Sequence, residues 1–279
     1  MEYALRLTSA DEPPNDARAA CSPSWRTLLP DGPTVALYFG SEFCEDRLPD
    51  VIEAIAFCDL ACEHGWEPTL VTPLVTPEGL RTVDRLLGAL AVNRREVSVV
   101  FNDWGVLGLL RTRHASVARR AGRLVNRSLR DPRAYRDAPA GTATHDAARY
   151  TRLRRFLGGL GVTAIESDAD LEGGYLGGGL DDDGAGLDRA LHLPFTFAAS
   201  GRGCPLKAAL YPEGGGFTKA FADRCPAPCR GKALPVTRPD TALPHWRAGN
   251  TLLYEIPTEA ARNWLPHTDR IVLHELPAP

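Results

Sequence analysis

VALYFGSEFCEDR, residues 35–47, opens a pattern that most of the chain follows. The apolar run at residues 35–39 predicts a buried strand, which ends at Gly40. The polar residues 41–47 predict a loop between this strand and a helix. The helix is predicted over residues 49–64, because apolar side chains recur there at helical spacing.

Further apolar runs repeat this pattern along the chain. With residues 35–39 they make eight predicted strands, the others being 70–72, 96–101, 122–125, 162–166, 191–197, 252–255 and 271–274. Helical patterns lie between most of them. The second helix begins at Thr76-Pro77-Glu78, where a capping residue, a proline and an acid stand in the order that helix starts favour.

Short apolar strands separated by helices predict a parallel α/β fold. Eight such strands favour a single TIM-type (β/α)8-like barrel with irregular later units, over residues 33–279. Residues 1–32 are polar and are predicted to be an irregular N-terminal segment. The alternative is an open doubly wound sheet, which is disfavoured because no glycine-rich phosphate loop follows the first strand.

The composition is that of an ordinary globular protein. Apolar residues make up 44% and charged residues 24%, and the net charge of -3 gives no sign of a nucleic-acid-binding surface. We see no secretory signal and no run of about 18 apolar residues that would span a membrane. We therefore expect a cytoplasmic protein, in which seven cysteines favour metal binding or redox chemistry over disulfides.

The segment SGRGCPLKAALYPEGGGFTKAFADRCPAPCRG, residues 200–231, forms a long cysteine-bearing loop after the sixth predicted strand. It is rich in turn formers and has few apolar residues to bury, so a bound metal or cluster is the simplest thing that would order it. Its spacing, Cys-x20-Cys-x3-Cys, leaves one thiolate missing from a four-ligand site. Cys44 is the candidate for the fourth ligand, because it too follows an apolar strand.

Two chemistries accept four thiolates, namely zinc and an iron–sulfur cluster. Structural zinc sites usually show two close cysteine pairs, whereas only one close pair is present here. This dispersal favours a cluster held by the tertiary fold, and the plain alternative is a set of unrelated free thiols. The candidate ligands are Cys44, Cys204, Cys225 and Cys229.

The other three cysteines have no predicted role in this site. Cys58 and Cys62 lie on the apolar face of the first predicted helix, so we expect both in the core. Cys21 lies in the polar N-terminal segment.

Polar residues follow several predicted strands, where catalytic residues of a barrel belong. Asp103 and Glu166 are candidate general bases. Either can serve as the base if burial raises its pKa towards neutrality. The alternative for Asp103 is a helix N-cap. Asn102 and Asn126 are candidate substrate contacts. Arginines can hold an anionic substrate, although any one of them taken singly is more simply a solvated charge; the candidates are Arg123, Arg202 and Arg230.

Four segments resemble a known family. They are GSEFCEDR (40–47), FNDWGVL (101–107), AGRLVN (121–126), and SGRGC (200–204) with the later Cys225-x3-Cys229. Together they are similar to the UbiV type of the collagenase-like, U-32 peptidase-related family. The four-cysteine set is the specific part of this resemblance. The chain departs from the family in its longer stretch between Cys204 and Cys225.

The resemblance implies a TIM-type barrel that carries a 4Fe-4S cluster on Cys44, Cys204, Cys225 and Cys229. It also implies a homologous, UbiU-like cluster-bearing partner and a role in oxygen-independent hydroxylation, as in ubiquinone biosynthesis. Related members hydroxylate RNA bases, with prephenate implicated as the oxygen source, and others carry the name of peptidases.

The leading hypothesis is therefore a cluster-bearing subunit of an oxygen-independent hydroxylase that acts on an aromatic or quinone-precursor-like small molecule. A collagenase-like peptidase is the first alternative, although the sequence has neither an HExxH nor a GxSxG motif. A non-catalytic binding module with a structural zinc site made by the four cysteines is the second.

Overall fold

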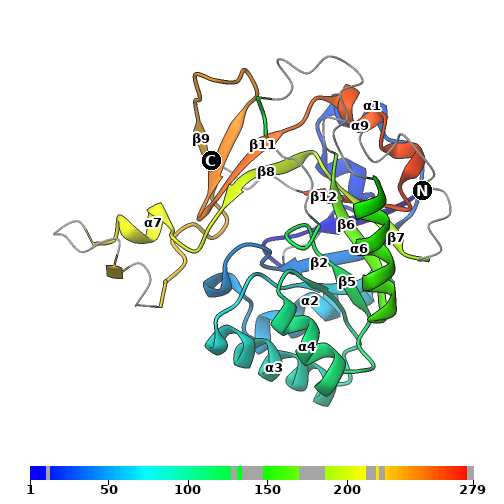
Figure 1. The fold of residues 1–279 in the computed structure, drawn as a ribbon, viewed down its shortest axis with the longest axis vertical. Helices are drawn as coiled ribbons and strands as arrows, with labels where there is room; N and C mark the ends of the chain where they lie inside the picture. The colour runs from blue at the N-terminus through cyan, green and yellow to red at the C-terminus, as the bar shows by residue number, and fades with distance from the viewer. Residues whose placement is uncertain are drawn as a thin grey trace.

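The computed structural model describes residues 1–10, 13–126, 131–133, 147–169, 186–211, 218–219 and 224–274. In this part of the chain eight parallel strands close into a barrel, which confirms the predicted TIM-type fold (Figure 1). Around the barrel they follow the order β1-β12-β7-β6-β5-β4-β3-β2. They are β1 (Glu2–Arg6), β2 (Thr34–Gly40), β3 (Glu67–Val71), β4 (Ser98–Phe101), β5 (Arg119–Ala121), β6 (Val162–Asp168), β7 (Asp188–Leu193) and β12 (Arg270–His274).

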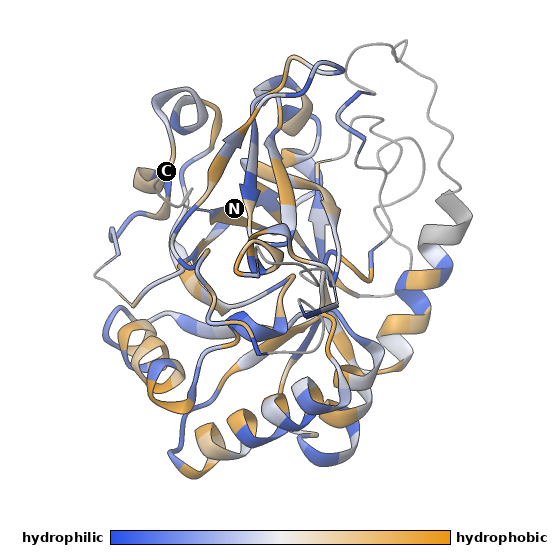
Figure 2. Cartoon of the chain, turned by 90° about the vertical axis from the view of Figure 1, so that its left-hand side faces the viewer, coloured by the Kyte–Doolittle hydropathy of each residue, from blue (hydrophilic) through white to orange (hydrophobic). Residues whose placement is uncertain are grey.

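Four helices pack outside the first strands: α2 (Val51–Glu63), α3 (Pro77–Val92), α4 (Trp104–Arg113) and α6 (Ala147–Gly159). Three of them begin at capping side chains that accept a backbone N–H, namely Asp50, Thr76 and Asp103. The apolar face of α3 buries Val83 and Leu87. Helices along the lower edge of Figure 2 are orange on one side and blue on the other, as expected for helices that cover a sheet.

The inside of the barrel is apolar at one level and polar at the next. The apolar level is built from Ala4, Ala36, Tyr38, Val71, Val100, Ala190 and Val272. Alternate residues of a strand face the same side, so the residues two positions further on also point inward. Those residues include Arg6, His192 and His274. The barrel interior therefore becomes polar towards the carboxyl ends of its strands.

A second, antiparallel sheet lies between β7 and β12 in the sequence. Its order is β8 (Phe195–Ser200), β11 (Thr251–Glu255), β10 (His245–Ala248) and β9 (Leu234–Val236). Short elements complete the described chain: η1 (Ala17–Ala20), α1 (Pro23–Leu28), η2 (Glu45–Arg47), α7 (Pro205–Ala208), α9 (Thr258–Arg262) and η4 (Leu265–His267). In Figure 1 this sheet rises from the barrel on the same side as α7.

The strand predictions need four corrections. Residues 2–6 are not irregular but form β1, which pairs with β12 and β2. The predicted strand 252–255 exists as β11 but belongs to the second sheet. Residues 191–197 span two strands, β7 and β8, of different sheets. Residues 122–125 are not a strand but a turn, in which Val125 N donates to Gly122 O, and the barrel strand β5 lies directly before them.

Two cysteines also differ from the prediction. Cys58 is buried as expected, but Cys62 is exposed near the end of α2. Cys21, which the sequence placed in a polar segment, is buried in the main apolar core.

No helix among the described residues is long and apolar enough to cross a membrane.

Candidate functional site

The four candidate cysteines line one small cavity of about 30 Å³. They come from three segments of the chain. Cys44 caps η2 after strand β2, and Cys204 caps α7 after strand β8. Cys225 and Cys229 lie in the turn that precedes β9. The convergence is thus a product of the tertiary fold and not of one local motif.

Asn250 ties two of these segments together. Its Nδ2 donates to the carbonyl oxygen of Phe43 at 2.6 Å and to that of Gly201 at 2.7 Å. Phe43 precedes Cys44, and Gly201 lies three residues before Cys204. One amide group therefore fixes the two cysteine-bearing loops relative to each other.

Two ion pairs bring further parts of this region together. Lys207 of α7 lies 3.5 Å from Asp46 in η2. Arg230, next to Cys229, donates to Glu53 of α2 at 2.6 Å. Because Arg230 is committed to Glu53, it does not act as the anion clamp that the sequence suggested.

Backbone atoms lie close to the thiols. Backbone N–H groups donate to the sulfurs of Cys204 and Cys225, each at 3.4 Å. Gly249 has a φ of +64°, and a Cβ there would lie 3.0 Å from Sγ of Cys229. Burial raises the pKa of the Cys44 thiol to about 11, so without a bound cation this thiol stays protonated.

Four thiols are a donor set that either a zinc ion or a cubane cluster accepts. Among the residues that the structure describes, no three His, Cys, Asp or Glu side chains are grouped to hold one metal ion. A zinc ion needs each sulfur at about 2.3 Å from a common point. A cubane cluster instead takes one thiolate on each of its irons, so its four sulfurs stand further apart.

A second cavity, of about 80 Å³, lies at the mouth of the barrel and is called the mouth cavity below. The carboxyl ends of strands β1, β2 and β12 form one side, and Phe195, Ala248 and Leu253 of the second sheet form another. It shares Cys44, Arg47 and Asn250 with the cysteine cavity. The two cavities are therefore neighbours, and the volume of the mouth cavity holds several waters or one small molecule.

Arg6 brings a cation to the mouth cavity, where the negative charge of Glu42 acts on it without a direct contact. Its guanidinium makes no hydrogen bond or ion pair to another described residue, and Nη1 is fully shielded from solvent. Burial lowers the pKa of Arg6 to about 10, so it stays charged at neutral pH. A buried donor without a partner is costly, which makes Arg6 a ready site for an anion.

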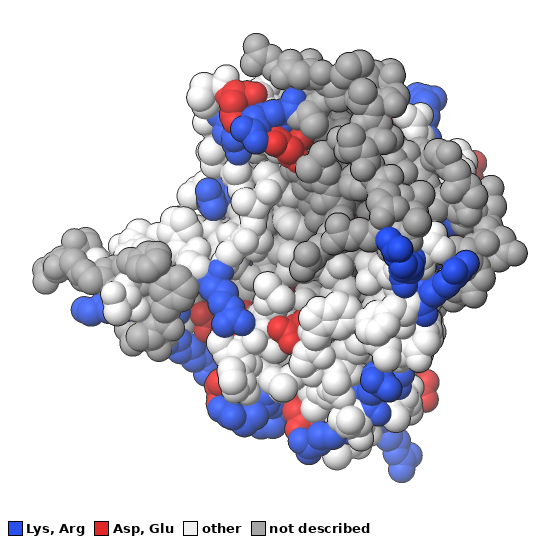
Figure 3. Space-filling view, viewed as in Figure 1, with Lys and Arg blue, Asp and Glu red and all other residues white. Residues whose placement is uncertain are grey.

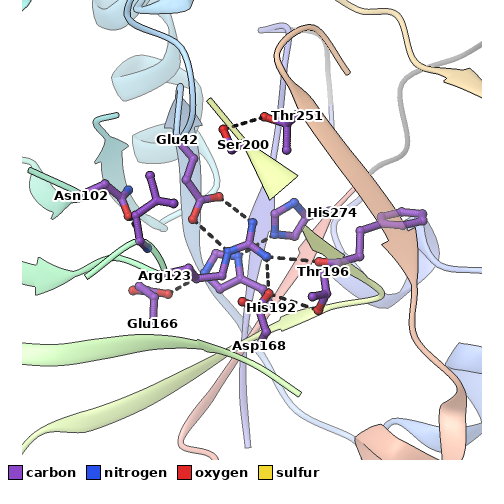
Figure 4. Close-up of polar contacts among 12 residues, drawn as sticks. Glu42, Asn102, Arg123, Glu166, Asp168, His192, Thr196, Ser200, Thr251 and His274 are labelled. Atoms are coloured by element: carbon purple, nitrogen blue, oxygen red, sulfur yellow. Dashed lines mark hydrogen bonds and ion pairs between the residues drawn. The ribbon is translucent and has the colours of Figure 1, made fainter. Parts of the chain in front are cut away.

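Arg123 occupies the wall of the mouth cavity but is fully engaged. It is 1% exposed and binds Glu42 through two hydrogen bonds of 2.8 and 2.6 Å. It also donates to Asp168 at 2.6 Å. Figure 4 shows Arg123 between these two carboxylates. Arg123 thus anchors the strand ends and is not the free anion clamp that the sequence allowed.

Glu166 lies one level deeper and does not line the mouth cavity. Its carboxylate accepts hydrogen bonds from Tyr38 at 3.1 Å and Arg120 at 2.8 Å, and its Oε2 lies 2.8 Å from His192 Nε2. Burial raises its pKa, but the charge of Arg120 and the hydrogen bonds outweigh burial and lower the pKa to about 2. The prediction that burial makes Glu166 a general base near neutral pH is therefore wrong.

Asn102 and Asp103 have structural partners. Asn102 donates to Thr72 O and accepts from Leu124 N, each at 2.9 Å, which joins the ends of three neighbouring strands. Asp103 accepts from Gly105 N at 2.7 Å and Val75 N at 3.3 Å. The alternative reading of Asp103 as an N-cap is confirmed, and neither residue lines the mouth cavity.

Asn126 and Arg202 also lie away from the mouth cavity. Asn126 donates to Glu166 O at 3.2 Å and to Ser167 Oγ at 3.0 Å, and it is 1% exposed. Arg202 donates to Val75 O at 3.2 Å and lines the cysteine cavity. Of the two, only Arg202 stands where it can meet a ligand of that cavity.

Sequence reasoning missed most residues of the mouth cavity. Glu42 was visible in the loop after the first strand, and His192 and His274 are polar residues inside apolar strands. Such residues are a signal, since a polar side chain at alternate positions of a barrel strand points inward. Arg6 could not be identified as a cavity residue from the sequence, because residues 2–6 were not predicted to be a strand.

A third cavity is a surface groove of about 720 Å³ between the starts of α2 and α3 and the cysteine region. It is open and lined mainly by charged side chains. Along the lower edge of Figure 3, acidic and basic side chains also stand side by side. The described part of this face therefore carries both signs of charge.

Comparisons with known proteins add little to these observations. No protein-family model and no curated protein matches the chain. Among solved structures, the U32 peptidase Mk0906 is similar, with 12% sequence identity and a TM-score of 0.44 over 100% of this chain and 94% of that chain. The barrel assignment accordingly rests on the strand order and register of this chain.

Proposed function

We propose that this protein is a 4Fe-4S cluster-bearing subunit of an oxygen-independent hydroxylase acting on an aromatic or quinone-precursor-like small molecule. One observation carries the proposal. Four cysteines from three segments surround a cavity that shares a wall with the mouth cavity. When bound, the cluster supplies electron transfer beside the substrate.

The residues of the chain have distinct tasks in this proposal. Cys44, Cys204, Cys225 and Cys229 hold the cluster. Arg6 and Arg47 line the mouth cavity, and neither guanidinium is paired with another described residue, so they bind an anionic group of the substrate. The second sheet covers the substrate and excludes water, which strengthens these charge interactions.

The family resemblance supports the same proposal through the GSEFC and SGRGC segments and the final cysteine spacing. It extends the proposal to a UbiU-like partner that carries a second cluster. The competing zinc module differs in one measurable respect, since it requires zinc and no iron. The competing peptidase differs in product, since it releases new peptide ends.

Growth without oxygen tests the function. In a strain that lacks the gene, we expect a precursor one oxygen atom short of the normal product to accumulate. Wild-type protein and Cys62→Ala should restore the product, because Cys62 lies outside the site, whereas Cys225→Ala should not. An unchanged metabolite profile with loss of a peptide-cleaving activity would overturn the proposal in favour of the peptidase.

A further inference from the structure

Two buried side chains, Glu166 and His192, and the half-buried His274 form a hydrogen-bonded chain that ends at the mouth cavity. His192 Nε2 lies 2.8 Å from Glu166 Oε2, and His192 Nδ1 lies 2.6 Å from His274 Nε2. Figure 4 shows His192 next to Glu166, and His192 lies between Glu166 and His274 in this chain. His274 lines the mouth cavity, whereas His192 and Glu166 do not. The chain therefore connects the barrel interior to the place where a ligand can bind.

The positions of the protons follow from the partners. Glu166 already accepts from Tyr38 and Arg120 and is ionised, so His192 must donate to it through Nε2. A neutral His192 then accepts at Nδ1, which requires His274 to donate through Nε2. Nδ1 of His274 is left with a lone pair, and it has no hydrogen-bond partner among the described residues.

Arg6 stands next to His274 in the barrel. The two residues are paired in the register of β1 and β12, and both line the mouth cavity. A proton acceptor and a cation without a hydrogen-bond partner thus line the same small cavity. This is the arrangement that takes up an acid, because one group receives the proton and the other holds the anion.

We propose that the mouth cavity is an acid–base site for a small carboxylic acid or enol, with Nδ1 of His274 as proton acceptor and Arg6 as the anion's partner. The H–X bond of the acid breaks, its proton bonds to Nδ1, and its electron pair stays on X beside Arg6. The reverse step returns the proton. His192 and Glu166 are positioning residues that fix the tautomer of His274.

The charges around His274 explain why the anion and the proton enter together. The charged groups that share the mouth cavity with it are Arg6, Glu42, Arg47 and Arg123, and His192 connects it to Glu166. Burial lowers the pKa of His274 well below its usual value, and His192, Arg123 and Arg6 lower it further. An anion that neutralises Arg6 removes one of these charges, so His274 accepts a proton more readily when the anion is bound.

Acetate binding to the full-length protein tests this inference. With ¹⁵N-labelled histidine, NMR of the free protein at neutral pH should show His274 neutral, with its proton on Nε2. Acetate should bind with uptake of one proton, so its affinity should rise up to about tenfold for each pH unit of acidification. Titration in two buffers of different ionisation enthalpy measures the same proton directly.

Matched variants assign the two roles. His274→Gln should make acetate affinity independent of pH, and Arg6→Gln should abolish binding. The controls are His64→Gln, a partly buried histidine stacked on Trp66, and Arg85→Gln on the exposed face of α3; both should behave as wild type. If a site variant fails to fold, the wild-type titration decides alone.

Three results would overturn the inference: no acetate binding, binding without proton uptake by wild type, or uptake that persists in His274→Gln. The measurement requires no iron. A protein that lacks the cluster but binds acetate with a proton would refute the proposed function and leave this inference standing. A protein that holds the cluster but does not bind acetate would refute this inference and leave the proposed function standing.

Discussion

Replacing Asn250 by alanine tests how the cysteine-bearing loops are held in place. The side chain is 7% exposed and donates to Phe43 O and Gly201 O. A hydrogen bond of this kind contributes about 0.5–1.5 kcal/mol, so losing two weakens the docking of the loops by about 1–3 kcal/mol. We therefore expect local opening of these loops to become about 5- to 150-fold more frequent.

Hydrogen exchange by mass spectrometry measures this opening. Peptides that cover residues 41–48 and 200–208 should exchange faster in Asn250→Ala, while peptides from the barrel strands β3 and β4 should not change. Asn250→Asp keeps the size but removes the donor, so it should behave like the alanine variant. Asn93→Ala removes a similar bond, to Ala89 O, at the exposed end of α3 and serves as control. Unchanged exchange at 200–208 in Asn250→Ala would refute the role of Asn250 in holding the two cysteine-bearing loops.

Three further predictions follow from the strand ends. Gly122→Ala would place a Cβ 2.2 Å from Asn102 Oδ1, so it should lower the free energy of unfolding in urea by about 2–4 kcal/mol; a loss under about 1 kcal/mol would contradict this. Asp103→Ala removes a cap and should cost about 1 kcal/mol without altering acetate binding. The lowered pKa of Glu166 means that its ionised carboxylate stabilises the fold by about 3 kcal/mol. This stabilisation is complete above pH 4.5, the pKa of the unfolded chain, and is lost progressively as the pH falls towards 2. Glu166→Gln leaves Arg120 without its partner, so the stability gap to wild type should be largest near neutral pH and shrink on acidification; a gap that does not depend on pH would contradict the assignment.

The sequence was informative wherever structure depends on local pattern. Alternating strands and helices predicted the barrel, and the cap at Thr76 was located correctly because its partner lies three residues away. The four cysteines were grouped correctly around one cavity, since each stands in a turn-rich loop near a strand end. Whether they hold a cluster stays a prediction.

The site at the barrel mouth could not be predicted in the same way. Glu166 reads as a candidate base, yet its protonation state is set by Arg120, 46 residues earlier, and by His192, 26 residues later. Similarly, β1 is a short run whose burial depends on pairing with β12 at the other end of the chain. Such partners are fixed by closure of the barrel, which no local pattern encodes.

The metal content of protein purified without oxygen tests whether the four cysteines hold a cluster. We predict a brown protein with about four irons and four sulfides per chain. Serine substitution at Cys44, Cys204, Cys225 or Cys229 should remove most of the iron, whereas Cys62→Ser should retain it because Cys62 is exposed on α2, outside the site. Colourless protein with one zinc per chain, or full iron content in Cys44→Ser, would contradict the account.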